Sequence, residues 1–130
     1  MEGSQRRPDA QLNVLGEPLT CCSHDPLTGF FRDGCCNTGP LDQCMHTVCA
    51  IVTDEFLEFS KAAGNDLSTP RPECGFVGLN DGDQWCLCAA RWEQARQAGK
   101  APKIRLAATN QASLAVCRLD DLKTHAIDLN

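Results

Sequence analysis

Cysteine is the residue type in this chain that is best suited to chemistry. The 130 residues include ten cysteines: Cys21, Cys22, Cys35, Cys36, Cys44, Cys49, Cys74, Cys86, Cys88 and Cys117. Sulfur at this density serves disulfide formation, metal ligation or nucleophilic thiol chemistry, or else it fills a core as a small apolar group. The spacing of the cysteines narrows these uses.

The pair Cys86 and Cys88 has the most informative local spacing. Residues two apart in a strand point to the same face, about 6.6–6.8 Å apart along the chain. That distance is at or beyond the reach of an unstrained disulfide. We therefore expect the two thiols to face the same way without joining each other. They would converge on a metal or on a thiol from a distant segment, unless both simply line the core.

The chain has no Cys-x-x-Cys knuckle, which argues against a zinc ribbon but allows a site assembled from separate segments. His46 lies three residues before Cys49, so a mixed Cys/His site for zinc or iron is chemically sensible. The alternative is a histidine that orders its loop through hydrogen bonds. The signatures of serine hydrolases, phosphate-binding loops and dinucleotide-binding proteins are not found in the sequence.

The composition is that of a folded acidic protein. The net charge is -5, the hydrophobic content is 42% and the charged content is 22%. The twelve basic residues are scattered, which argues against nucleic acid as a partner, and no apolar stretch approaches the roughly 20 residues that span a bilayer. Residues 1–10 contain no apolar run that could form the core of a signal peptide. We therefore expect a cytoplasmic protein whose cysteines remain thiols.

The turn signals and apolar patterns predict an α+β fold, a small mixed β-sheet with packed helices and two long ordered loops. The loops cover residues 21–42 and 64–83, which are rich in Gly, Pro, Asp and Asn. The pattern predicts strands over 46–53, 84–90 and 103–109, and helices over 54–63, 91–98, about 110–116 and 119–126. A flexible segment 1–11 would precede a single globular domain of residues 12–130.

Several long motifs in the sequence are distinctive when taken together. They are Leu15-Gly16-Glu17-Pro18-Leu19, the run from Cys22 to Gly39, His46-Thr47-Val48-Cys49-Ala50, the run from Gly64 to Pro70, and Gly82-Asp83-Gln84-Trp85-Cys86-Leu87-Cys88-Ala89 with Arg91-Trp92. With these motifs the chain resembles a small, mostly bacterial family catalogued as domain of unknown function 2237, over roughly residues 12–128. This resemblance implies a stand-alone soluble domain with no assigned activity, cofactor or substrate.

The resemblance also separates the cysteines at family positions from those peculiar to this chain. Family positions are occupied by Cys22, Cys36, His46, Cys49, Cys86 and Cys88, and often by Cys35. The other four cysteines, Cys21, Cys44, Cys74 and Cys117, are peculiar to this chain, and we expect them to be packing residues. A scheme of five disulfides, which would need all ten cysteines, is disfavoured.

Three functions remain open from the sequence. The first is a module in which Cys22, Cys36, His46, Cys49, Cys86 and Cys88 meet and bind a transition metal, zinc or iron, or act as redox thiols. The second is an enzyme with a cysteine nucleophile, assisted by His46 or Asp33; Cys35 and Arg32 are further secondary candidates. The third is an interaction protein whose cysteines are core residues and whose 64–83 loop is a contact surface.

Overall fold

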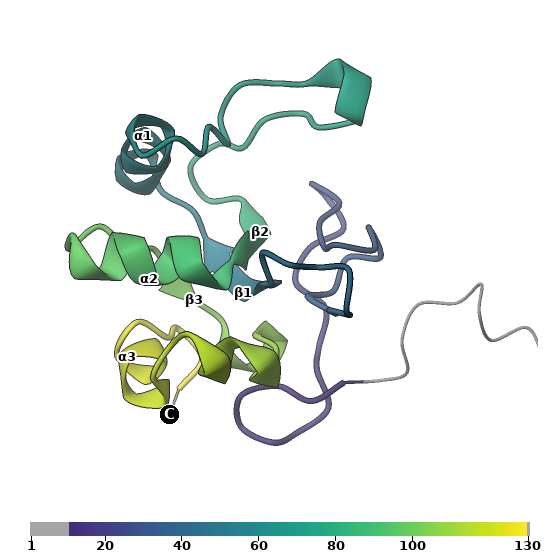
Figure 1. Ribbon diagram of the computed structural model, residues 1–130, viewed down its shortest axis with the longest axis vertical. Helices are drawn as coiled ribbons and strands as arrows, with labels where there is room; N and C mark the ends of the chain where they lie inside the picture. The colour runs from purple at the N-terminus through teal and green to yellow at the C-terminus, as the bar shows by residue number, and fades with distance from the viewer. Residues whose placement is uncertain (1–10, 130) are drawn as a thin grey trace, which may run out of the picture.

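The computed structural model describes residues 11–129, and a small antiparallel sheet lies at its centre (Figure 1). The strands are β1 (His46–Ile51), β2 (Gln84–Cys88) and β3 (Lys103–Ile104), in the order β2-β1-β3. Both neighbouring pairs run antiparallel, and an isolated parallel bridge joins Ile104 to Ala126. With the helices described below, this arrangement confirms the predicted α+β class.

Three helices cover one side of the sheet (Figure 1). They are α1 (Asp54–Ala62), α2 (Ala89–Gln97) and α3 (Leu119–Thr124). Helix α1 begins as predicted, because the Thr53 side chain accepts a hydrogen bond from the backbone N–H of Phe56. Helix α2 holds the largest fully buried side chain, Trp92, whose indole N–H donates to the carbonyl of Pro102 at 3.2 Å.

The third predicted strand is much shorter than expected. Only Lys103 and Ile104 pair with β1, and the chain then turns into the 3-10 helices η3 (Leu106–Ala108) and η4 (Gln111–Ala115). The alternation of charged and apolar residues indicated a strand with one wet face. However, Leu106 and Ala108 are both fully buried in a 3-10 turn that does not continue the pairing with β1, so the alternation extends beyond the strand.

The loop of residues 21–42 is ordered by contacts with strand β2 and with itself. The Thr28 hydroxyl accepts a hydrogen bond from the backbone N–H of Cys86 at 2.8 Å, and the Thr28 carbonyl accepts one from Gly34. Gly34 has a φ of +88°, and a Cβ there would collide with the ring of His24. The turn chemistry seen in the sequence therefore produces a fixed segment against the strand.

The second loop, residues 64–83, contains the short 3-10 helix η2 (Pro72–Cys74) and extends away from the sheet (Figure 1). Its predicted final turn is confirmed by the hydrogen bond from the Asp83 N–H to the Asn80 carbonyl at 3.0 Å. Within residues 11–129, no helix is long and apolar enough to cross a bilayer. Of the segment expected to be flexible, residues 1–10 lie outside the described part.

Candidate functional site

Six of the ten cysteines form three disulfides. The pairs are Cys21–Cys35, Cys22–Cys49 and Cys36–Cys86. The expectation that the cysteines remain thiols is therefore wrong for these six. The expectation that Cys21 is a packing residue is also wrong, because it is covalently bound to Cys35.

Two of the disulfides lie side by side in the core. Cys49 of β1 and Cys86 of β2 are directly opposite in the strand register, and each is bonded to a cysteine of the 21–42 loop. The sulfurs of Cys22, Cys36 and Cys86 lie within 4.8 Å of one another. The sequence predicted this gathering, since four of the five expected cysteines meet here. We call Cys22, Cys36, Cys49 and Cys86 the sulfur cluster.

The sulfur cluster differs chemically from the predicted metal site. Cysteine binds a metal as a thiolate, and a disulfide sulfur has no thiolate to offer. In the bonded form the cluster joins a long loop to strands β1 and β2, and its members are buried. Ligation of zinc or iron by these sulfurs would first require reduction of both disulfides.

A cavity of about 470 Å³ lies beside the cluster and brings together His46 and Cys88, the two other members of the predicted thiol and metal site. Its walls come from the 21–42 loop, from the start of β1, from the end of β2 with the first turn of α2, and from the 64–83 loop. The lining residues are Gly29, Phe30, Arg32, Cys44, His46, Asn65, Asp66, Leu67, Arg71, Phe76, Trp85, Cys86, Leu87, Cys88 and Arg91. Two free thiols, Cys44 and Cys88, therefore share a cavity with His46.

Cys88 lies where strand β2 ends and helix α2 begins. Its sulfur donates to the backbone carbonyl of Cys44 at 2.9 Å, and it pairs with His46 in the register of β1 and β2. Burial raises the pKa of the Cys88 thiol, whereas the N–H groups of Arg91 and Ala90 and the charge of Arg91 act in the opposite direction. Burial therefore keeps the Cys88 thiol protonated. If it loses the proton, the thiolate can accept hydrogen bonds from the N–H groups of Ala90 and Arg91.

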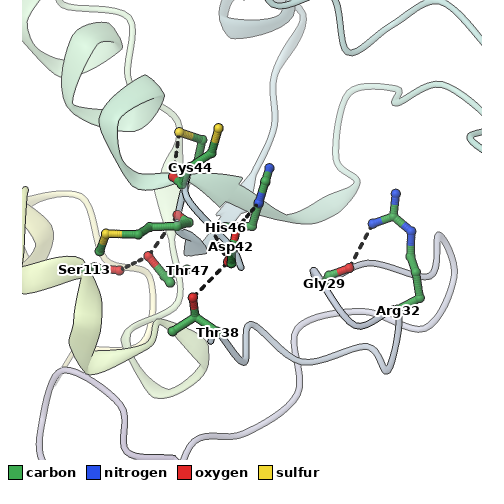
Figure 2. A network of polar contacts seen from close by, with 10 residues as sticks. Gly29, Arg32, Thr38, Asp42, Cys44, His46, Thr47 and Ser113 are labelled. Atoms are coloured by element: carbon green, nitrogen blue, oxygen red, sulfur yellow. Dashed lines mark hydrogen bonds and ion pairs between the residues drawn. The ribbon is translucent and has the colours of Figure 1, made fainter. Parts of the chain in front are cut away.

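His46 is oriented by Asp42, the last residue of the 21–42 loop (Figure 2). The His46 Nδ1 lies 2.7 Å from one Asp42 carboxylate oxygen. The other oxygen accepts from the His46 backbone N–H and from the Thr38 hydroxyl, both at 2.9 Å. The Asp42 side chain is fully buried and that of His46 is 39% exposed. Because Nδ1 faces a carboxylate, it carries the proton, and Nε2 is left to accept one.

The secondary candidates have different surroundings. Arg32 lines the cavity, where its guanidinium carbon lies 5.3 Å from the centre of the Trp85 ring and its Nη1 donates to the Gly29 carbonyl (Figure 2). Asp33 hydrogen bonds within its own loop, accepting from the Cys35 backbone N–H and the Asn37 amide. Cys35 is bonded to Cys21. Of these three, Arg32 alone is among the cavity-lining residues of the described chain.

The remaining cysteines divide into exposed and buried. Cys44 and Cys74 are exposed, so the expectation that they pack is wrong for both. Cys117 is buried at 2% exposure, as expected, with its sulfur 3.6 Å from the Ala89 carbonyl. Its burial raises the pKa of the thiol to about 12.

The buried thiol of Cys117 makes stability depend on alkaline pH. In the unfolded chain it ionises near its ordinary pKa of 9.0, but in the folded protein only near 12. The folded state therefore binds more protons in this window, and its stability falls as the pH rises.

We expect the free energy of unfolding to fall by up to about 1.4 kcal/mol per pH unit above pH 9. Urea unfolding at about pH 8 and about pH 10 measures this slope. Cys117→Ala should flatten it, and an identical slope in that variant would contradict the assignment.

Fold and site together define a small, cysteine-rich α+β protein that has three disulfides and two free thiols in a cavity beside them. The family model described as "uncharacterized protein conserved in bacteria (DUF2237)" matches residues 12–126. The chain therefore belongs to this family, as the sequence motifs indicated. No curated protein matches the chain.

Proposed function

We propose that this protein carries out thiol–disulfide exchange at Cys88, with His46 as the base. This reading joins two of the functions predicted from sequence, the redox thiol module and the cysteine nucleophile. The observation that carries it is the position of Cys88 on the wall of a cavity, across the strand register from His46, whose ring is oriented by the buried Asp42.

In the first step, Cys88 attacks one sulfur of a small disulfide in the cavity. His46 Nε2 takes the thiol proton as the new S–S bond forms between Cys88 and that sulfur. The substrate S–S bond breaks, and its second half leaves as a thiolate that receives the proton from His46. The products are a mixed disulfide on Cys88 and one free thiol, so electrons and protons balance.

In the second step, Cys44 resolves the mixed disulfide. Its sulfur attacks the Cys88 sulfur, the remaining half of the substrate leaves as a thiol, and an internal disulfide joins the two cysteines. The substrate has then gained two electrons and two protons, which Cys44 and Cys88 have lost. A low-molecular-weight thiol returns the pair to its reduced form by the reverse exchange. The contact of the Cys88 sulfur with the Cys44 backbone supports this assignment.

The neutral reagent bis(2-hydroxyethyl) disulfide tests the proposal at neutral pH, with the modified cysteine identified by peptide mass spectrometry. We expect Cys88 to react at least about tenfold faster than Cys74, an exposed thiol that is not among the residues lining the cavity. The wild-type adduct should disappear as Cys44 resolves it, whereas in Cys44→Ser it should persist. His46→Gln should slow the reaction of Cys88 without changing that of Cys74. Equal rates at Cys88 and Cys74 would overturn the proposal.

A second candidate function is metal binding by the sulfur cluster in its reduced form. Its support is the mutual distance of at most 4.8 Å among three of the sulfurs, which would give one metal ion three thiolates after reduction. The test is elemental analysis of protein prepared with reductant throughout, without added metal. Stoichiometric zinc or iron that is lost in Cys36→Ser, but retained in Cys74→Ser, would establish this function. Metal-free reduced protein would remove it.

A further inference from the structure

Positive charge is concentrated on the cavity, although the chain as a whole has a net charge of -5. Three arginines from three different segments line it: Arg32 from the first loop, Arg71 from the second loop and Arg91 from the first turn of α2. The lining contains one carboxylate, that of Asp66. Within the described cavity wall, cations therefore outnumber anions.

Asp66 offsets only one of the three arginine charges, and its carboxylate oxygens accept hydrogen bonds within its own turn. One oxygen accepts from the backbone N–H and hydroxyl of Ser68, and the other accepts from the Thr69 hydroxyl at 2.6 Å. These bonds hold its pKa at about 2. An anion in the cavity would therefore meet the net positive charge of three arginines and one ionised carboxylate.

The hydrogen bonds described for Arg32 and Arg91 use only Nη1 of each side chain. Arg32 donates to the Gly29 carbonyl, and Arg91 donates to the carbonyl of Ala63 and the side chain of Gln94. A guanidinium has five N–H donors in a fixed fork that matches carboxylate, sulfonate or phosphate oxygens. These backbone contacts fix the two forks in place and leave further donors for a ligand.

Aromatic rings form part of the remaining wall. The rings of Phe76 and Trp85 meet edge to face with their centres 5.3 Å apart, and Phe30 stacks against His46 at 6.4 Å. Aromatic walls favour the carbon skeleton and sulfurs of a small organic molecule, whereas the arginines favour its charged ends. The thiol of Cys88 lies on the same wall.

We infer that the cavity selects small disulfides and thiols that carry negatively charged groups, through Arg32, Arg71 and Arg91. This inference rests on the proposed exchange reaction and names its substrate class. The arginines bind the anionic groups, and the aromatic walls hold the chain that connects them to the sulfur. Binding thereby places a substrate sulfur beside Cys88 and raises its effective concentration there.

Three disulfides with the same two-carbon arms and different charges test the inference. They are the dianionic bis(2-sulfonatoethyl) disulfide, the neutral bis(2-hydroxyethyl) disulfide and the dicationic cystamine. Each rate at Cys88 is divided by the rate of the same reagent with the urea-unfolded protein, which removes differences in intrinsic reactivity. We expect the order anionic, neutral, cationic, with at least about a tenfold ratio between the ends that shrinks at high salt.

Two charge reversals provide a matched comparison. Arg71→Glu changes the charge at the cavity, and Arg118→Glu makes the same change at an exposed position before α3. The anionic-to-cationic ratio should fall at least about fivefold in Arg71→Glu and by less than twofold in Arg118→Glu. Equal ratios in the two variants, or equal normalised rates for the three reagents in the wild type, would overturn the inference.

Failure of the inference is distinguishable from failure of the proposed function. If the neutral reagent reacts selectively at Cys88 but charge has no effect, the exchange function stands and the inference falls. If Cys88 does not react, unreactive butane-1,4-disulfonate still tests the charged site by NMR titration of Cys88→Ser. Shifts of the amides of Ala90 and Arg91 that are absent in Arg71→Glu would support anion binding, and no saturable shift would exclude it.

Discussion

Replacement of both Cys36 and Cys86 by alanine should lower the free energy of unfolding by about 4 kcal/mol. This disulfide joins residues 50 apart in sequence, so it removes much of the conformational entropy of the unfolded chain. Both side chains are buried, at 0% and 1% exposure, and their loss also leaves unfilled space in the core. Urea unfolding of the oxidised protein measures the change.

The Cys21–Cys35 disulfide provides the matched control, because it closes a loop of only 14 residues and Cys21 is exposed. The corresponding double alanine variant should lose less, about 3 kcal/mol or below. The Cys22–Cys49 pair, with a separation of 27, should fall between the two. A larger loss for Cys21–Cys35 than for Cys36–Cys86 would contradict this order.

Asp42→Ala should cost about 3 to 4 kcal/mol of stability, a large effect for a single substitution. The buried carboxylate accepts hydrogen bonds from the His46 backbone N–H, the His46 ring and the Thr38 hydroxyl. The substitution leaves these partly buried donors beside an apolar methyl group. It also frees the His46 ring, so exchange at Cys88 should slow in whatever fraction remains folded.

Asp120→Ala is the control for Asp42→Ala, since Asp120 is exposed in the first turn of α3. A change below about 1 kcal/mol is expected there, from the weaker interaction with the helix dipole. Urea unfolding compares the two variants. A loss below about 1 kcal/mol for Asp42→Ala would show that the Asp42 hydrogen bonds do not stabilise this loop.

The central part of the fold could be predicted because its signals are local. The β-branched run beginning at His46 forms β1, and the N-cap at Thr53 begins α1 where the pattern placed it. Strand β3 was predicted too long, since its length depends on how much of β1 remains unpaired on that edge. No local pattern contains that information.

The candidate site could be predicted only in part. The sequence indicated that distant cysteines gather, and four of them do. It also indicated that Cys86 and Cys88 do not bond to each other, which is confirmed. The sequence did not predict that four of these cysteines form disulfides in the core, whereas Cys88 remains a free thiol on the cavity wall. Asp42 was missed as well, although its spacing of four from His46 offered a signal.

The order of residues along the chain determined which cysteines can lie on strands and which loops must turn tightly, and its composition showed that the chain is rich in cysteine. Those properties depend on neighbours in sequence and follow from backbone geometry. Tertiary structure alone decided the partners: Cys36 meets Cys86 across 50 residues, and three arginines from separate segments surround one cavity. The reason is that contacts between distant segments depend on how whole elements pack, and a short stretch of sequence does not specify that packing.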